Sequence, residues 1–264
     1  MTYDLYQVDA FTRRVFRGNP AAVCPMDDWP ADEVLLNIAR ENNLSETAYI
    51  IPRKGYWDIR WFTPAGEMDL AGHPTLAAAW TIFRMPKLGG SRLDAVVFRT
   101  RDAGDLTVRR DGDLLVMDFP ARPGVDRPPP KALVQALGFE PVAARKARDW
   151  LVAAADPETV AACDPDMGAL RGVVSGVEGI IITAPGREAD FVSRYFAPEL
   201  GIEDPVTGSA HCTLVPYWSE RLGKTRLRAR QISRRGGELV LEHRGDRVSI
   251  GGEACLYLEG RITI

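Results

Sequence analysis

Two stretches of the chain, one in each half, follow the same pattern. A Phe-x-Pro tripeptide occurs at 62–64 and again at 196–198, and each leads through a small, polar, glycine-containing loop into an apolar run. In these runs, at 72–80 and 208–218, a Thr-Leu pair and a Trp keep the same spacing. The repetition predicts two similar halves, and two such loops together are suited to holding one anionic substrate from both ends.

The length and one proline-rich segment set the expected domain boundaries. The 264 residues are enough for one large domain or for two of roughly 130 residues each. The segment at 120–130 contains five prolines in eleven residues, which fits neither a helix interior nor a central strand. We therefore predict an N-terminal domain at 1–120, a linker at 121–128 and a C-terminal domain at 129–264, whose final strand is free to cross back to the first domain.

Hydrophobic patterns predict the same order of elements in both halves. Helices that are apolar on nearly every side are expected at 76–85 and 212–221, among segments with the composition of strands joined by Gly and Asp turns. One strand is expected near Thr159, and Glu46 has a positional counterpart in Glu178. A sheet that curls around such a helix buries it on all sides. No G-x-G-x-x-G or Walker A sequence supports a nucleotide-binding fold.

Composition and charge exclude several classes of partner. The net charge is −3, so neither a nucleic acid nor a membrane surface is an expected partner. The N-terminus lacks the charged and apolar regions of a signal peptide, and no apolar run approaches the ~18 residues of a membrane-spanning helix. The four cysteines form no C-x-x-C pair, which indicates free thiols in a reducing cytoplasm.

Glu46 is the strongest candidate for acid–base chemistry. It lies in the segment 43–47, Asn-Leu-Ser-Glu-Thr, between a predicted helix end and a strand. Its neighbours Leu44, Ala48 and Tyr49 are uncharged, so we expect partial desolvation, which disfavours the ionised form of a carboxyl group. Such a group is suited to both giving and taking a proton near neutral pH. The alternative, a solvated surface glutamate, stays open on position alone.

The two matched loops supply candidates for anion binding. Gly72 and His73 precede the first apolar helix, and helix N-termini bind carboxylate or phosphate through N–H groups and the helix dipole. In the second half, Asp204 is either a turn residue or a functional acid. The run Thr207-Gly208-Ser209 after it has the composition of an anion-binding nest.

Two further chemistries compete with structural roles in the same loops. His73 and His211 occupy both of them, so a metal site is conceivable, but no metal-ligand spacing supports it and we predict no metal. Cys212 lies where the second helix is expected to begin, a position that lowers the pKa of a thiol. We nevertheless expect it to be a small core residue.

In order along almost the whole chain, these motifs resemble the PhzF phenazine-biosynthesis-like family. The resemblance is carried by Asp9-Ala10-Phe11, Gly18-Asn19-Pro20-Ala21-Ala22-Val23, Asn43-Leu44-Ser45-Glu46-Thr47, Phe62-Thr63-Pro64, Ala71-Gly72-His73-Pro74-Thr75 and Asp204-Pro205-Val206-Thr207-Gly208-Ser209. It implies the α+β fold of diaminopimelate epimerase, in which two similar domains each wrap a β-barrel-like mixed sheet around a central apolar helix. It also implies an active site between the domains, no cofactor and a homodimer.

The resemblance implies roles for individual residues as well. In the phenazine enzyme a glutamate moves a proton within a cyclohexadiene amino acid, and the matching motif identifies that glutamate with Glu46. His73 and Asp204 match residues that orient the substrate and assist proton transfer. The substrate-binding residues that it implies are Gly72, Thr207, Gly208 and Ser209.

We therefore expect a cofactor-independent isomerase that shifts a proton on a small carboxylate-bearing substrate, either amino-acid-like or cyclic. An epimerase or racemase is one alternative, with Asp204 or His73 as the base opposed to Glu46. The two opposed cysteines of the related epimerases are absent from the matching loops. A non-catalytic protein that binds small carboxylates is the other alternative. We interpret the motif at 18–20 as structural, shaping the entry to a strand.

Overall fold

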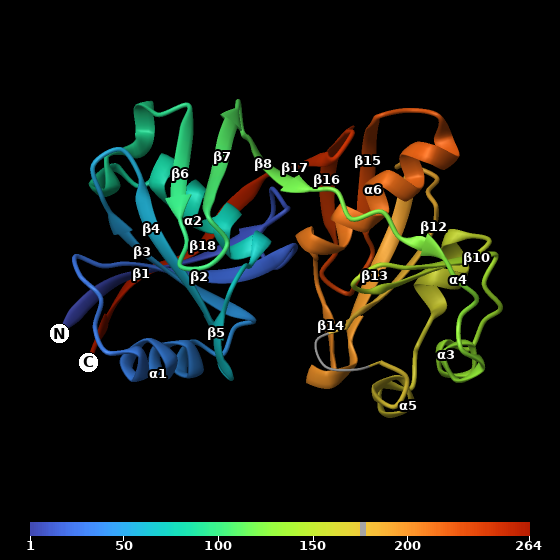
Figure 1. Cartoon of the computed structure of the whole chain (residues 1–264). Helices are drawn as coiled ribbons and strands as arrows, with labels where there is room; N and C mark the ends of the chain where they lie inside the picture. Colours follow the sequence, from blue (N-terminus) through green and yellow to red (C-terminus); the bar gives the residue numbers. More distant parts are fainter. Residues whose placement is uncertain (175–177) are drawn as a thin grey trace. The chain divides into compact units, whose positions relative to one another are not determined.

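The computed structural model describes residues 1–174 and 178–264 (Figure 1). The chain divides into two units, of which the first contains Met1–Asp118 and Gly251–Ile264 and the second contains Phe119–Ile250. The last segment therefore belongs with the first unit, although the whole second unit precedes it in the sequence. Among the described residues, no helix is both long enough and apolar enough to cross a membrane.

The first unit is a mixed sheet. Its strands are β1 (Thr2–Ala10), β2 (Asn19–Pro25), β3 (Glu46–Pro52), β4 (Trp57–Thr63), β5 (Gly66–Met68), β6 (Ala95–Arg99), β7 (Asp105–Asp111), β8 (Leu114–Pro120) and β18 (Ala254–Thr263). Pairing follows the order β18–β1–β2–β3–β4–β6–β7–β8, in which β2–β3 and β4–β6 are parallel and the other pairs antiparallel. The short β5 folds back against β4.

The second unit repeats most of this topology. Its strands are β9 (Val125–Asp126), β10 (Ala143–Lys146), β11 (Trp150–Ala153), β12 (Ile180–Pro185), β13 (Phe191–Ala197), β14 (Ile202–Asp204), β15 (Arg226–Gln231), β16 (Gly237–Arg244) and β17 (Arg247–Gly252). Pairing follows β9–β10–β11–β12–β13–β15–β16, with β11–β12 and β13–β15 parallel and β14 folded against β13. Strand β9 thus takes the place that β18 has in the first unit.

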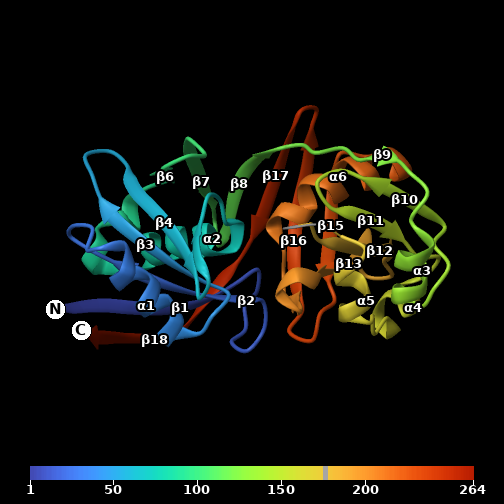
Figure 2. The ribbon, with the colours of Figure 1, turned by 60° about the horizontal axis from the view of Figure 1, so that its bottom comes forward.

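Each unit buries one long helix, α2 (Gly72–Arg84) or α6 (Gly208–Leu222) (Figure 2). Nearly every side chain of both helices is buried, since almost all are apolar or small. The Thr75 and Thr81 hydroxyls donate to carbonyl groups of the preceding turn, so these polar groups need no water. The predicted fold, two similar units that each wrap a barrel-like mixed sheet around a central apolar helix, is confirmed.

Both central helices begin four residues before their predicted starts. The sequence Gly-His-Pro had suggested a loop before the first of them. Pro74 is the third residue of α2. The N–H groups of the first turn have no acceptor within the helix, so the N–H group that proline lacks is not needed there. Proline is therefore compatible with the helix at this position, and His73 lies inside the first turn.

Shorter helices cover the outer faces of the sheets. They are α1 (Asp32–Asn42), α3 (Lys131–Leu137), α4 (Pro157–Ala162) and α5 (Met167–Arg171), with single 3-10 turns at Pro86–Leu88, Gly90–Arg92 and Pro198–Leu200. The strand predicted near Thr159 is wrong, because α4 occupies this segment. The Asp156 side chain accepts a hydrogen bond of 2.7 Å from the Thr159 amide, and Pro157 follows as the first helical residue.

The proline-rich segment and the end of the chain both contribute strands to the sheets. Within the proline-rich segment, β9 pairs antiparallel with β10, so this part of the chain belongs to the second sheet. At the end of the chain, β18 pairs with β1 from Thr2 to Ala10. The two chain ends lie side by side (Figures 1 and 2), and the Ile264 amide donates to the Met1 carbonyl oxygen at 2.8 Å.

Candidate active site

Glu46 and His73 lie next to each other in the first unit. Glu46 is the first residue of β3, which runs parallel to β2, and α2 packs against both strands. His73 is the second residue of α2, and its Nε2 atom lies 3.1 Å from Oε2 of Glu46. The side chain of His73 is only 7% exposed and that of Glu46 only 15%. Two residues that are 27 positions apart in the sequence thus form one buried acid–imidazole contact.

The imidazole in this contact is neutral. Burial lowers the pKa of His73 to about 3, and a weaker interaction with the Pro20 backbone acts in the opposite direction. The Nδ1 atom of His73 lies 3.3 Å from Nδ2 of Asn19, whose side chain is fully buried. The neutral ring thus lies between Asn19 and the Glu46 carboxyl group and places no full positive charge beside that group.

Asn19 owes its position to the glycine before it. Gly18 has a φ of +64°, and a Cβ atom at this residue would overlap the carbonyl oxygen of Ala10. The chain therefore needs glycine here in order to enter β2 with Asn19 turned into the core. The motif at 18–20 shapes a strand entry, as predicted, but no pattern in the sequence indicated that Asn19 also contacts His73.

The start of α2 leaves backbone donors available. Its N-cap residue, Ala71, has no side chain that can accept from the first amides of the helix, and no side-chain cap forms. The N-cap of α6, Thr207, also makes no side-chain cap. Amide groups at both helix starts, including those of Gly72 and Gly208, are therefore suited to binding an anion.

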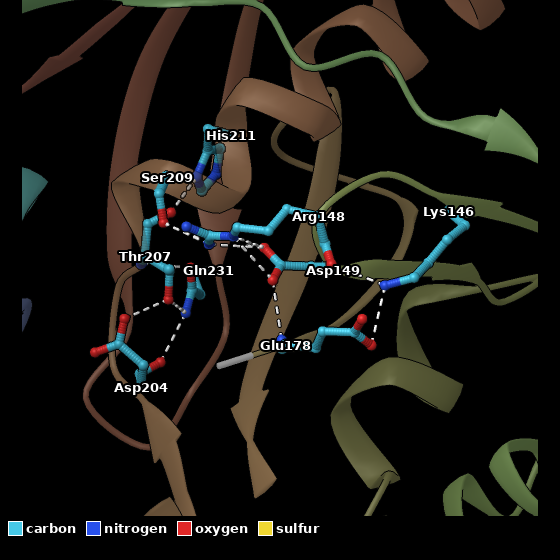
Figure 3. A network of polar contacts seen from close by, with 10 residues as sticks. Lys146, Arg148, Asp149, Glu178, Asp204, Thr207, Ser209, His211 and Gln231 are labelled. Carbon is cyan, nitrogen blue, oxygen red and sulfur yellow. Dashed lines mark hydrogen bonds and ion pairs between the residues drawn. The ribbon is translucent and has the colours of Figure 1, made fainter. Parts of the chain in front are cut away.

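In the second unit, Asp204 and Thr207 are tied together by a buried glutamine (Figure 3). The Thr207 hydroxyl donates to Oδ2 of Asp204. Gln231 accepts from the Thr207 amide at 2.9 Å and donates to the Asp204 carbonyl oxygen at 2.7 Å. The Thr207 hydroxyl is thus bonded to Asp204, and its amide is bonded to Gln231 of β15. Gln231 was not among the predicted site residues, although a polar residue on the buried side of the alternating strand β15 is a recognisable signal.

Ser209 contacts an arginine that the sequence analysis also missed. Nη2 of Arg148 lies 3.3 Å from Oγ of Ser209 and 2.8 Å from Oδ2 of Asp149 (Figure 3). Asp149 is 3% exposed, and its Oδ1 atom accepts from the Gly179 amide at 2.9 Å. Nothing in the local pattern of the Arg-Asp pair distinguished it from a surface ion pair.

His211 has a different environment from His73. It is the fourth residue of α6, is fully buried and contacts the Thr207 carbonyl oxygen through Nδ1 at 2.8 Å. Burial lowers its pKa to about 4. Its ring lies 6.0 Å from that of Phe191, so its surroundings are those of a core residue. Burial likewise raises the pKa of the Cys212 thiol to about 11, which fits the packing role expected for it.

The counterpart of Glu46 in the second unit is Gly179, not Glu178. In the first unit Thr47 pairs with the Phe of the Phe-x-Pro motif, and in the second unit Ile180 does so. The residue before each is therefore Glu46 or Gly179. A Cβ atom at Gly179 would overlap the Tyr195 hydroxyl, so an acidic side chain there would have to displace Tyr195. Glu178 instead lies 3.1 Å from Lys146.

Each unit thus holds its own group of predicted site residues. Glu46, His73 and Gly72 lie together in the first unit, and Asp204, Thr207, Gly208 and Ser209 lie together in the second. Within residues 1–174 and 178–264, no group of three His, Cys, Asp or Glu side chains is arranged to hold a metal ion.

The chain is similar to known proteins over its whole length. A sequence model of the family described as phenazine biosynthesis-like protein matches residues 8–260. An uncharacterized isomerase of Pseudomonas aeruginosa is 49% identical, with 100% of both chains covered. A human phenazine biosynthesis-like domain-containing protein is 38% identical, again with 100% of both chains covered.

Solved structures agree with these relatives. The crystal structure of a PhzF-family protein from Enterococcus faecalis has a TM-score of 0.95 and 43% identity, and 100% of both chains is covered. A hydroxyproline epimerase from Agrobacterium vitis has a TM-score of 0.64 at 11% identity, covering 99% of this chain and 92% of that one, a likeness of fold alone. Sequence and structure together place the chain in the phenazine biosynthesis-like (PhzF) family.

Proposed function

We propose that the protein is an isomerase that moves a proton on a small carboxylate-bearing substrate, amino-acid-like or cyclic, without a cofactor. Glu46 is the general acid and base, and His73 holds its carboxyl group. The observation that carries this proposal is the 3.1 Å contact between the Glu46 carboxyl group and a buried imidazole. Asp204 assists the proton transfer, and the residues proposed to bind substrate are Gly72, Thr207, Gly208 and Ser209.

The neutral state of His73 suits this role. A protonated imidazole would hold Glu46 as a carboxylate and oppose its protonation, whereas a neutral ring lets the carboxyl group take up a proton and return it. An acid–base group placed in this way contributes roughly 10²–10⁴ in rate. Amide groups at a helix start stabilise the negative charge that a substrate carboxylate carries.

The second unit supports a mechanism with one glutamate rather than two matched bases. Gly179 occupies the position that corresponds to Glu46, and Tyr195 fills the space that a side chain there would need. A single acid–base group that removes a proton from one carbon and returns it to another gives an isomerisation. This asymmetry favours proton transfer within the substrate over inversion by two symmetric bases.

The Glu46→Gln variant tests the proposal. The protein is incubated in D₂O with a panel of small carboxylates, and deuterium uptake at carbon is followed by mass spectrometry. We expect the wild type to exchange at least one of them and Glu46→Gln to lose at least a hundredfold in rate, on the order of the contribution of one acid–base group. Glu41→Gln, at an exposed position of α1, is the matched control and should keep the full rate. If Glu46→Gln exchanged deuterium at the wild-type rate, Glu46 would not be the acid–base group.

A further inference from the structure

Arg148 is held in a fixed orientation beside the start of α6. Its Nε atom lies 3.2 Å and 3.3 Å from the two oxygens of Asp149, and its Nη2 atom donates to Oδ2 at 2.8 Å. Asp149 is anchored in turn by the Gly179 amide. A guanidinium group held through two of its nitrogens by a buried carboxylate has little rotational freedom, and its planar fork fixes the direction of the remaining donors.

The contact with Ser209 has a defined direction. Arginine only donates hydrogen bonds, so Oγ of Ser209 must be the acceptor at 3.3 Å. The hydroxyl hydrogen of Ser209 is then directed away from Arg148 and is available to a ligand. Donation by a charged group to an oxygen makes the O–H group of that oxygen a stronger donor.

Charge and exposure also fit a role in ligand binding. The Arg148 side chain is 41% exposed, whereas Asp149 is 3% exposed, so the carboxylate faces the interior and the guanidinium faces outward. The Asp149 hydrogen bonds use Nε and Nη2, and Nη1 lies outside them. Arg148 therefore brings a positive charge next to the amide groups that begin α6.

We propose that Arg148 is a positioning residue that orients the Ser209 hydroxyl toward a substrate carboxylate and gives this subsite its preference for an anion over a neutral amide. Asp149 holds Arg148 in place and does not contact the substrate. The inference rests on the proposed function, in which Ser209 binds the carboxylate. It adds the arginine that the sequence motifs did not include.

The test uses a variant in which both charges are removed. Arg148→Gln alone leaves the buried Asp149 without its partner and is expected to unfold the region. Arg148→Gln/Asp149→Asn keeps similar volumes and avoids that problem. The probes are anthranilate and benzoate, each compared with its primary amide by calorimetry. The matched control is Arg187→Gln/Glu158→Gln, which removes an exposed ion pair of the same unit.

We expect the wild type to bind the acids more tightly than the amides. The Arg148→Gln/Asp149→Asn protein should bind the acids about ten- to a hundredfold more weakly, the range for a charged hydrogen bond, and the amides as before. In a Ser209→Ala background the same double change should cost much less, because the two residues act together. The Arg187→Gln/Glu158→Gln control should bind like the wild type.

Other outcomes overturn the proposal in distinguishable ways. Equal weakening for acids and amides, or full additivity with Ser209→Ala, would mean that Arg148 acts only through general structure. If the wild type bound none of the acids, both the carboxylate subsite and the substrate class would be wrong. The role of Glu46 would stand or fall separately, on the deuterium exchange of Glu46→Gln.

Discussion

At the residue scale, the protein keeps two imidazoles neutral by burying them. His73 and His211 each lie in the first turns of a central helix, and burial lowers their pKa values to about 3 and about 4. In the unfolded chain both rings titrate near the ordinary value of 6.5. Between the folded and unfolded pKa values, only the unfolded state binds the proton. Stability is therefore fully present above about pH 6.5 and falls as the pH drops toward 4.

Replacing His211 with Asn should reduce this acid sensitivity. The Asn amide can still donate to the Thr207 carbonyl oxygen, but it does not titrate. Each protonating group adds up to about 1.4 kcal/mol of destabilisation per pH unit in this window. Urea unfolding between about pH 4 and pH 7 should therefore give a shallower fall in the free energy of unfolding for His211→Asn than for the wild type.

The third histidine provides the control for this experiment. His243 lies in β16, outside the central helices. The His243→Asn variant should keep the wild-type slope of stability against pH. An unchanged slope in His211→Asn would show that the imidazole does not carry the linkage.

At the element scale, the position just before β12 is restricted to glycine by the packing of Tyr195. The Gly179→Ala change places a methyl group into the Tyr195 ring, and overpacking of this kind costs about 1–3 kcal/mol. Gly66→Ala in β5 is the matched control, since nothing lies within 4 Å of its added Cβ atom. Chemical denaturation should show a loss of stability for the first variant and a change within about 0.5 kcal/mol for the second. Equal stabilities would contradict the packing argument.

Elements with a strong compositional signal were predictable from the sequence. Helices α2 and α6 stood out because nearly every residue in them is apolar or small. Their first turns did not, because Pro74 suggested a loop. The strand expected near Thr159 followed from local composition, whereas Asp156 and Pro157 together form a helix start.

The candidate site was predictable only where one segment carries the information. The motifs singled out Glu46 and His73, but their contact depends on the pairing of β2 with β3 and on the packing of α2. Gln231 and Arg148 contact predicted residues from segments with no motif of their own. The choice between Gly179 and Glu178 as the counterpart of Glu46 depends on a register shift of one residue, which composition does not reveal.

At the scale of the whole molecule, one sheet is completed by a strand from the far end of the chain. In the first unit β18 returns from the C-terminus to pair with β1, whereas in the second unit β9 comes from the same continuous stretch of chain as β10. The pairings from β1 to β7 and from β10 to β16 correspond in order and direction. The first sheet needs β18 beside β1. The packing does not depend on whether β18 is connected to the sheet at the start or at the end of the chain.

A circular permutant tests this view of the connectivity. A flexible linker of about six residues joins Ile264 to Met1, whose backbone groups already hydrogen-bond, and new ends are opened between Arg127 and Pro128 in the exposed proline-rich segment. All strand pairs are kept, so the free energy of unfolding should stay within about 2 kcal/mol of the wild type, as expected for a changed loop. A permutant with the same linker but opened inside β4, between Ile59 and Arg60, breaks a central strand and should not fold. Failure of the first permutant to give the wild-type circular dichroism spectrum would show that the native chain order is required.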